Sequence, residues 1–211
     1  MTPEMHLDEL ILRYPSLSAI RNDIERAFNI LKVCYESGGK LLIAGNGGSS
    51  ADAEHIVGEL MKGFVKRREV PEDMADKLIA ADSRRGEELA KKLQGALPAI
   101  ALSGHPSLST AYLNDVDGDL IFAQQTYGYG RKGDVLLGIS TSGNSKNVMY
   151  SISVAKTLGM KCIGLTGKDG GQLKKEADAA IVVPENETYK IQELHLPIYH
   201  ALCLMLEEHF F

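Results

Sequence analysis

Short runs of consecutive apolar residues recur along the chain, each followed by a segment with helical periodicity. Residues 41–44 (Leu-Leu-Ile-Ala) form one run, and residues 135–139 form another. Runs of this length between turn residues are typical of strands buried on both faces of a parallel sheet. Strands are predicted at residues 40–45, 98–103, 134–139, 160–165 and 179–183.

The segments between these strands have apolar positions spaced for helices. The predicted helices are residues 17–36, 50–63, 106–114, 146–158, 170–176 and 191–211. Strands that alternate with helices predict an α/β fold, here one doubly wound parallel sheet of five strands with helices on both faces. Ligands bind such sheets at the carboxyl ends of the strands.

The predicted helices at 17–36 and 191–211 are apolar on more than one side. A helix that packs only against its own sheet needs one apolar face. We therefore expect both helices to belong to an oligomeric helical layer between subunits.

Residues 72–97 do not fit a minimal α/β domain, because they are charged and helix-prone where a short link would suffice. Apolar positions such as Met74, Leu78 and Leu89 predict one or two amphipathic surface helices with a break near Ser83 or Gly86. The segment is either a solvated excursion or a lid or subunit contact beside a site, and we favour surface or interface over catalysis.

Composition narrows the class of protein. The 211 residues carry a formal net charge of −5, which argues against a nucleic-acid binder that neutralises phosphates. No apolar run is long enough to span a bilayer, and the N-terminus lacks a signal-peptide pattern. Cys34, Cys162 and Cys203 lie far apart in apolar contexts, which predicts reduced, buried thiols of a cytoplasmic protein.

Two loops that follow predicted strands are suited to phosphate. Residues 45–50 (Gly-Asn-Gly-Gly-Ser-Ser) lead into a helix that Ser49, Ser50 or Asp52 can cap. Residues 140–145 (Ser-Thr-Ser-Gly-Asn-Ser) lead into another helix and carry four hydroxyl groups. Helix N-termini and hydroxyls favour an anion, although either loop alone is also typical of an ordinary capped turn. Together they predict a phosphosugar or similar ligand.

Two segments carry candidate catalytic groups. His55 and Glu59 are four residues apart, on one face of the helix after the first loop. In the last helix, helical geometry pairs Glu193 with His200 and Gln192 with His195, and Pro197 complicates that geometry. With His55 and Glu59 these side chains could form a zinc site, or they could supply an acid–base pair. Their spacing does not decide between the two.

The sequence resembles the sugar isomerase (SIS) domain proteins, and more closely the phosphoheptose isomerases. The resemblance covers most of the chain and rests on GNGGSSADAEH with Glu59, AYLNDVDGD, GDVLLGISTSGNSKNV, LTGKDGG and IQELHLPIYH. It implies one SIS domain over residues 1–211, with a helical insertion at about 72–97. It also implies a cytoplasmic homotetramer with active sites at subunit interfaces, and no nucleic-acid or membrane partner.

The resemblance further implies the reaction and its residues. Sedoheptulose 7-phosphate would be converted to D-glycero-D-manno-heptose 7-phosphate through an enediol(ate), with Glu59 as the base. His200 would protonate the oxygen or return the proton. Zinc would be held at His55, Glu59, Gln192 and His200. The implied substrate contacts are Asn46, Gly47, Gly48, Glu59, Asn114, Asp115, Ser140, Thr141, Ser142, Ser145 and Gln192.

Two alternatives stay open. Some SIS proteins of this size do no chemistry and act as assembly or regulatory factors, in which the loops persist and the acid–base residues are lost. Glu59 and His200 are both present here, which favours an enzyme. The other alternative is an isomerase of a different phosphosugar, such as a hexulose or pentulose phosphate.

Overall fold

The apolar runs form strands that are buried along nearly their whole length. The computed structural model describes residues 2–211 and contains one sheet in which each pair of neighbouring strands is parallel. The strands are β1 (Leu41–Gly45), β2 (Ala99–Ala101), β3 (Val135–Ser140), β4 (Lys161–Thr166) and β5 (Ala179–Val182). Their order in the sheet is β2-β1-β3-β4-β5. The predicted five-stranded parallel α/β fold is confirmed.

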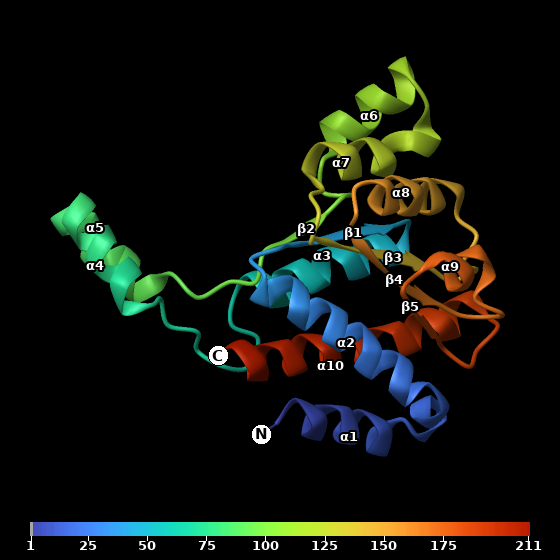
Figure 1. Ribbon diagram of the computed structural model, residues 1–211, viewed down its shortest axis with the longest axis horizontal. Helices are drawn as coiled ribbons and strands as arrows, with labels where there is room; N and C mark the ends of the chain where they lie inside the picture. The colour runs from blue at the N-terminus through green and yellow to red at the C-terminus, as the bar shows by residue number, and fades with distance from the viewer. Residues whose placement is uncertain (1) are drawn as a thin grey trace.

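Helices cover both faces of this sheet, and side chains that alternate along each strand divide the core in two (Figure 1). Ile43 and Leu137 pack with one layer, whereas Leu42 and Leu136 pack with the other. The first layer contains α1 (Pro3–Arg13), the 3₁₀ helix η1 (Pro15–Ile20), α2 (Arg21–Glu36), α3 (Gly48–Met61) and α10 (Thr188–Phe210). The second contains α7 (Ile121–Tyr129), α8 (Lys146–Thr157) and α9 (Gly171–Glu176), with α6 (Pro106–Asp115) and η2 (Gly118–Leu120) beside α7 and α8.

The topology places the two serine-rich loops together. The chain leaves β1 through α3 on one face of the sheet, and it leaves the adjacent β3 through α8 on the other face. Loops that diverge from neighbouring parallel strands in this way open a crevice, which is where doubly wound sheets bind ligands. The fold therefore directs attention to the carboxyl ends of β1 and β3.

Residues 72–92 form a hairpin of two short helices, α4 (Glu72–Ala81) and α5 (Ser83–Lys92), that projects away from the sheet (Figure 1). The break lies at Asp82, whose carboxylate accepts a hydrogen bond from the backbone N–H of Arg85 at 2.9 Å. An aspartate in this position caps the start of a helix. Met74 and Leu89 remain exposed on the hairpin.

Three local features differ from the sequence-based expectation. Helix α3 begins at Gly48, with Gly47 as its cap, so Ser49, Ser50 and Asp52 lie inside the helix and do not cap it. Helices α1 and α7 were not predicted. Helix α10 begins at Thr188, before the predicted start at residue 191, and Pro197 lies inside it, as in the predicted helix. No helix within residues 2–211 is long and apolar enough to cross a membrane.

Candidate active site

The loops after β1 and β3 are joined by a pair of amides. The side chains of Asn46 and Asn147 exchange two hydrogen bonds, both of 2.9 Å. Asn46 follows β1, and Asn147 lies in the first turn of α8. Gly47 has a φ of 55° and turns the chain into α3. This bridge holds the N-termini of α3 and α8, each of which has free backbone donors, at one edge of the sheet.

Residues 140–145 form a loop rich in internal hydrogen bonds. The hydroxyls of Ser140 and Ser145 are 2.9 Å apart, and the hydroxyl of Ser142 accepts from the N–H of Asn144 at 3.2 Å. The carbonyl of Thr141 accepts from the N–H of Gly167 at 3.3 Å. The loop presents hydroxyls and backbone N–H groups and contains no lysine. These donors can bind an oxyanion although the loop carries no fixed positive charge.

Glu59 lies on α3 between two nitrogen groups. Its Oε1 is 3.2 Å from Nε2 of His55, and its Oε2 accepts from Nζ of Lys62 at 3.2 Å. The side chain of Glu59 is 13% exposed, whereas that of His55 is 42% exposed. The predicted pairing of His55 with Glu59 is therefore present, in a partly desolvated setting where a carboxylate interacts strongly with its neighbours.

Helix α10 brings a second set of polar groups to α3. The ring centroids of His200 and His55 are 4.9 Å apart, with the planes nearly perpendicular. The Gln192 amide lies against Gly48, so closely that a Cβ atom at Gly48 would overlap it. Gln192 thus reaches the start of α3, and His200 reaches its third turn. Glu193, which simple helical geometry had paired with His200, is exposed.

Tyr199 fixes the orientation of His55. Its hydroxyl donates to Asp52 at 3.3 Å and lies 3.0 Å from Nδ1 of His55. With Glu59 at Nε2, the Tyr199 hydroxyl at Nδ1 holds the His55 ring between α10 and the third turn of α3. Burial raises the pKa of Asp52 above its ordinary value. The hydrogen bond from Tyr199 and the electrostatic effect of His55 lower this pKa, but by less than burial raises it. Tyr199 was not predicted, because a tyrosine in an apolar helix resembles any core residue.

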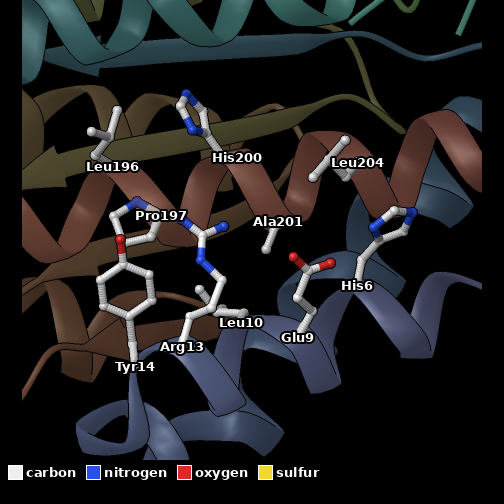
Figure 2. Close-up of a pocket in the computed structure, with 10 residues that line it drawn as sticks. All are labelled: His6, Glu9, Leu10, Arg13, Tyr14, Leu196, Pro197, His200, Ala201 and Leu204. Carbon is white, nitrogen blue, oxygen red and sulfur yellow. The ribbon is translucent and has the colours of Figure 1, made fainter. Parts of the chain in front are cut away.

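His200 forms part of the wall of a small cavity, about 160 Å³, between α1 and α10. Figure 2 shows Arg13 and Tyr14 reaching from α1 toward α10, while the ring of His200 points away from α1. Burial lowers the pKa of His200. His55 and Arg13 lower this pKa further, whereas Glu59 raises it. Its Nε2 is buried and has no hydrogen-bond partner within residues 2–211.

His195 lies deeper in α10 and is fully buried. Burial lowers its pKa to about 4, against the raising by a backbone hydrogen bond with Thr166. The ring is therefore neutral at pH 7. Its position in the core separates it from Gln192, with which helical spacing had grouped it.

Asn114 and Asp115 are the predicted substrate residues that the structure leaves apart from this cluster. They end α6, are exposed, and hydrogen-bond to each other at 2.8 Å. Within residues 2–211, neither side chain hydrogen-bonds to another of the predicted site residues. Lys62 and Asn147 were not predicted as site residues, yet they belong to the site. Lys62 hydrogen-bonds to Glu59, and Asn147 hydrogen-bonds to Asn46.

The residues suit a zinc ion by their chemistry. Nε2 of His55 and Oε1 of Glu59 lie 3.2 Å apart, and an imidazole nitrogen and a carboxylate oxygen are both ligands that zinc accepts in proteins. The unpartnered Nε2 of His200 is a further donor atom. Within residues 2–211, however, no three His, Cys, Asp or Glu side chains are already arranged to hold a metal ion.

Comparisons with known proteins agree on one family. The family model of the SIS domain matches residues 16–92 and 78–167. The phosphoheptose isomerase of Nitratiruptor sp. is 46% identical over 171 residues, which are 81% of this chain and 78% of that protein. That of Helicobacter pylori (strain P12) is 38% identical over 195 residues, 92% of this chain and 88% of that protein.

Solved structures give the same result. The phosphoheptose isomerase GmhA of Neisseria gonorrhoeae has a TM-score of 0.73 and 32% identity, covering 97% of this chain and 96% of its own. A phosphoheptose isomerase of Francisella tularensis has a TM-score of 0.76 and 31% identity, with the same coverage. The chain belongs to the SIS domain family and, within it, to the phosphoheptose isomerases.

The loop at residues 140–145 makes a direct prediction about ligand binding. Gly143 has a φ of 66°, and a Cβ atom there would overlap the carbonyl oxygen of Gly170. An alanine at such a position costs about 1–3 kcal/mol, so Gly143→Ala is expected to displace the loop and weaken phosphate binding about tenfold or more. Titration calorimetry with inorganic phosphate measures this. Gly128→Ala, at a helical glycine with open space around it, is the control and should bind normally.

Proposed function

We propose that this protein is an aldose–ketose isomerase that converts sedoheptulose 7-phosphate to D-glycero-D-manno-heptose 7-phosphate. The observation that carries the proposal is the convergence of Glu59 and His200, from helices far apart in sequence, on the ring of His55. Membership of the phosphoheptose isomerases supports this substrate, and the presence of both acid–base residues favours an enzyme over a non-catalytic regulator.

The loops bind the part of the substrate that does not react. Hydroxyls of Ser140, Thr141, Ser142 and Ser145, with the free N–H groups at the start of α8, receive the 7-phosphate. Asn46, Gly47 and Gly48 line the neighbouring turn, and we keep Asn114 and Asp115 as proposed contacts at the outer part of the sugar. Binding energy from the phosphate then holds the reacting carbons beside α3.

Glu59 and His200 carry out the proton transfers. The carboxylate of Glu59 removes a proton from C1 of the ketose, the electron pair forms the C1–C2 double bond, and the carbonyl oxygen on C2 becomes an enediolate oxygen. The hydroxyl proton on O1 passes to O2, C2 takes up a proton, and the C1–O1 bond becomes the carbonyl of the aldose. His200 protonates the oxygen or returns the proton. The Nζ of Lys62 donates a hydrogen bond to Oε2 of Glu59 at 3.2 Å, while Oε1 lies beside His55.

The base assignment predicts the effect of one substitution. Glu59→Gln keeps the size of the side chain and removes its basicity, so turnover of sedoheptulose 7-phosphate is expected to fall at least about 10³-fold with the fold intact. A coupled assay for the aldose product measures this, with circular dichroism as the folding control. Substantial activity in the folded variant contradicts the assignment.

We propose zinc as the cofactor, held by His55, Glu59, Gln192 and His200. Bound there, the ion would act as a Lewis acid for the developing oxyanion. Chelation is expected to abolish turnover, and zinc in slight excess to restore it, with the metal content followed by elemental analysis. Full activity in a protein shown to be free of metal contradicts a zinc requirement while leaving the isomerase assignment intact. A panel of shorter ketose phosphates tests the alternative substrates in the same assay.

We further propose a cytoplasmic homotetramer with its active sites at subunit interfaces. Leu12 on α1, Val33 on α2 and Leu196 on α10 are exposed apolar side chains in the helical layer, and all three cysteines are buried free thiols. Light scattering on the purified protein is expected to give four times the mass of one chain. A monomer that is fully active contradicts this arrangement.

A further inference from the structure

We propose that Arg68, together with Glu207 at the end of α10, is a positioning residue for the base Glu59. The inference rests on the proposed role of Glu59. Arg68 lies beyond the end of α3, and Glu207 lies 139 residues later in the chain. Neither side chain lines the cluster around His55, so both act on the reaction through the backbone that carries Glu59.

Arg68 binds the C-terminal end of α3. Its Nη2 donates to the carbonyl of Glu59 at 2.9 Å, and its Nη1 donates to the carbonyl of Leu60 at 2.7 Å. The last carbonyls of a helix have no partner within the helix, and a basic side chain can satisfy them. The planar fork of the guanidinium contacts both carbonyls with two separate N–H groups, in a fixed geometry that a lysine ammonium lacks.

Glu207 holds the guanidinium and the chain that leads to it. Its Oε1 accepts from Nε of Arg68 at 2.8 Å, and the carboxylate also accepts three backbone N–H groups, from Phe64, Val65 and Lys66, at 2.8, 2.9 and 3.1 Å. The Arg68 and Glu207 side chains are 0% and 1% exposed. Burial raises the pKa of Glu207, but these hydrogen bonds outweigh it and hold the pKa below its ordinary value, so the carboxylate is ionised at pH 7.

This clamp ties the base to the helix that carries the acid. Glu59 sits on α3, whereas His200 sits on α10 two turns before Glu207. Arg68 spans the two helices and fixes the carbonyl of Glu59 itself. A misplacement of about 1 Å can cost about a hundredfold in rate, so a contact that fixes this backbone governs catalysis. Replacing both members of a buried ion pair by neutral residues is often close to neutral for stability, so the pair can be removed to test its effect on the base.

The test removes the charged pair as a unit. Arg68→Met alone would leave the Glu207 carboxylate buried without its charge partner, so the variant of choice is Arg68→Met with Glu207→Gln, in which the amide oxygen still accepts from the loop. We expect a folded protein whose kcat is about 10- to 100-fold lower, with KM for sedoheptulose 7-phosphate within about twofold because the phosphate loop is untouched.

Arg67→Met is the matched control, since Arg67 is exposed and pairs with Glu69 at 3.8 Å. It should behave as the wild type.

A second measurement does not depend on turnover. Hydrogen–deuterium exchange in the peptide 57–66 is expected to accelerate in the double variant and to stay unchanged in Arg67→Met. Wild-type kcat in the folded double variant overturns the proposal. If the wild-type protein itself is inactive on sedoheptulose 7-phosphate, the proposed function fails. The clamp is tested separately, because unchanged exchange at 57–66 in the double variant overturns it whatever the turnover. Should the double variant not fold, Arg68→Lys replaces it, and an unchanged kcat there overturns the proposal.

Discussion

The packing of α10 against α3 is the contact on which the candidate active site depends. It brings Gln192 onto Gly48, the ring of His200 to within 4.9 Å of His55, and the hydroxyl of Tyr199 to Nδ1 of His55. Without it, the ends of β1 and β3 would still form a crevice, but His200 and Tyr199 would no longer lie beside His55. The crevice is thus built by the sheet, and the cluster around His55 by one helix pair.

The same division explains how an acidic protein can hold a phosphosugar. With a net charge of −5 the chain has no general attraction for anions, so the phosphate must be bound by local dipoles and hydroxyls at the helix N-termini. Such donors are fixed in direction, which positions a long substrate better than a mobile lysine does. The length of the sugar then sets where its reacting end lies relative to the phosphate. The partly buried setting of Glu59 strengthens the electrostatic interactions at that end.

The sequence predicted those features that depend on local periodicity. The central strands could be located because β1 and β3 are buried on both faces, and the His55–Glu59 pair because residues four apart lie on one face of a helix. Helical geometry alone paired Glu193 with His200, whereas the structure leaves Glu193 exposed and places Gln192 against Gly48. Such geometry fixes positions around one helix and not the neighbour that each face meets. The contact between Arg68 and Glu207 could not be predicted from the sequence for the same reason, because only the tertiary packing of α10 brings the two residues together. Asn114 and Asp115, drawn from the family pattern, remain proposals, because α6 holds them apart from the cluster.

The most direct test of proton transfer at Glu59 is isomerisation of sedoheptulose 7-phosphate in D₂O, followed by NMR over many turnovers. A base that shares its proton with solvent is expected to place deuterium on C1 of the ketose and C2 of the aldose. Neither label should appear with Glu59→Gln. Interconversion by the wild-type protein without incorporated deuterium would indicate a hydride shift between the two carbons, and would contradict an enediolate formed by Glu59.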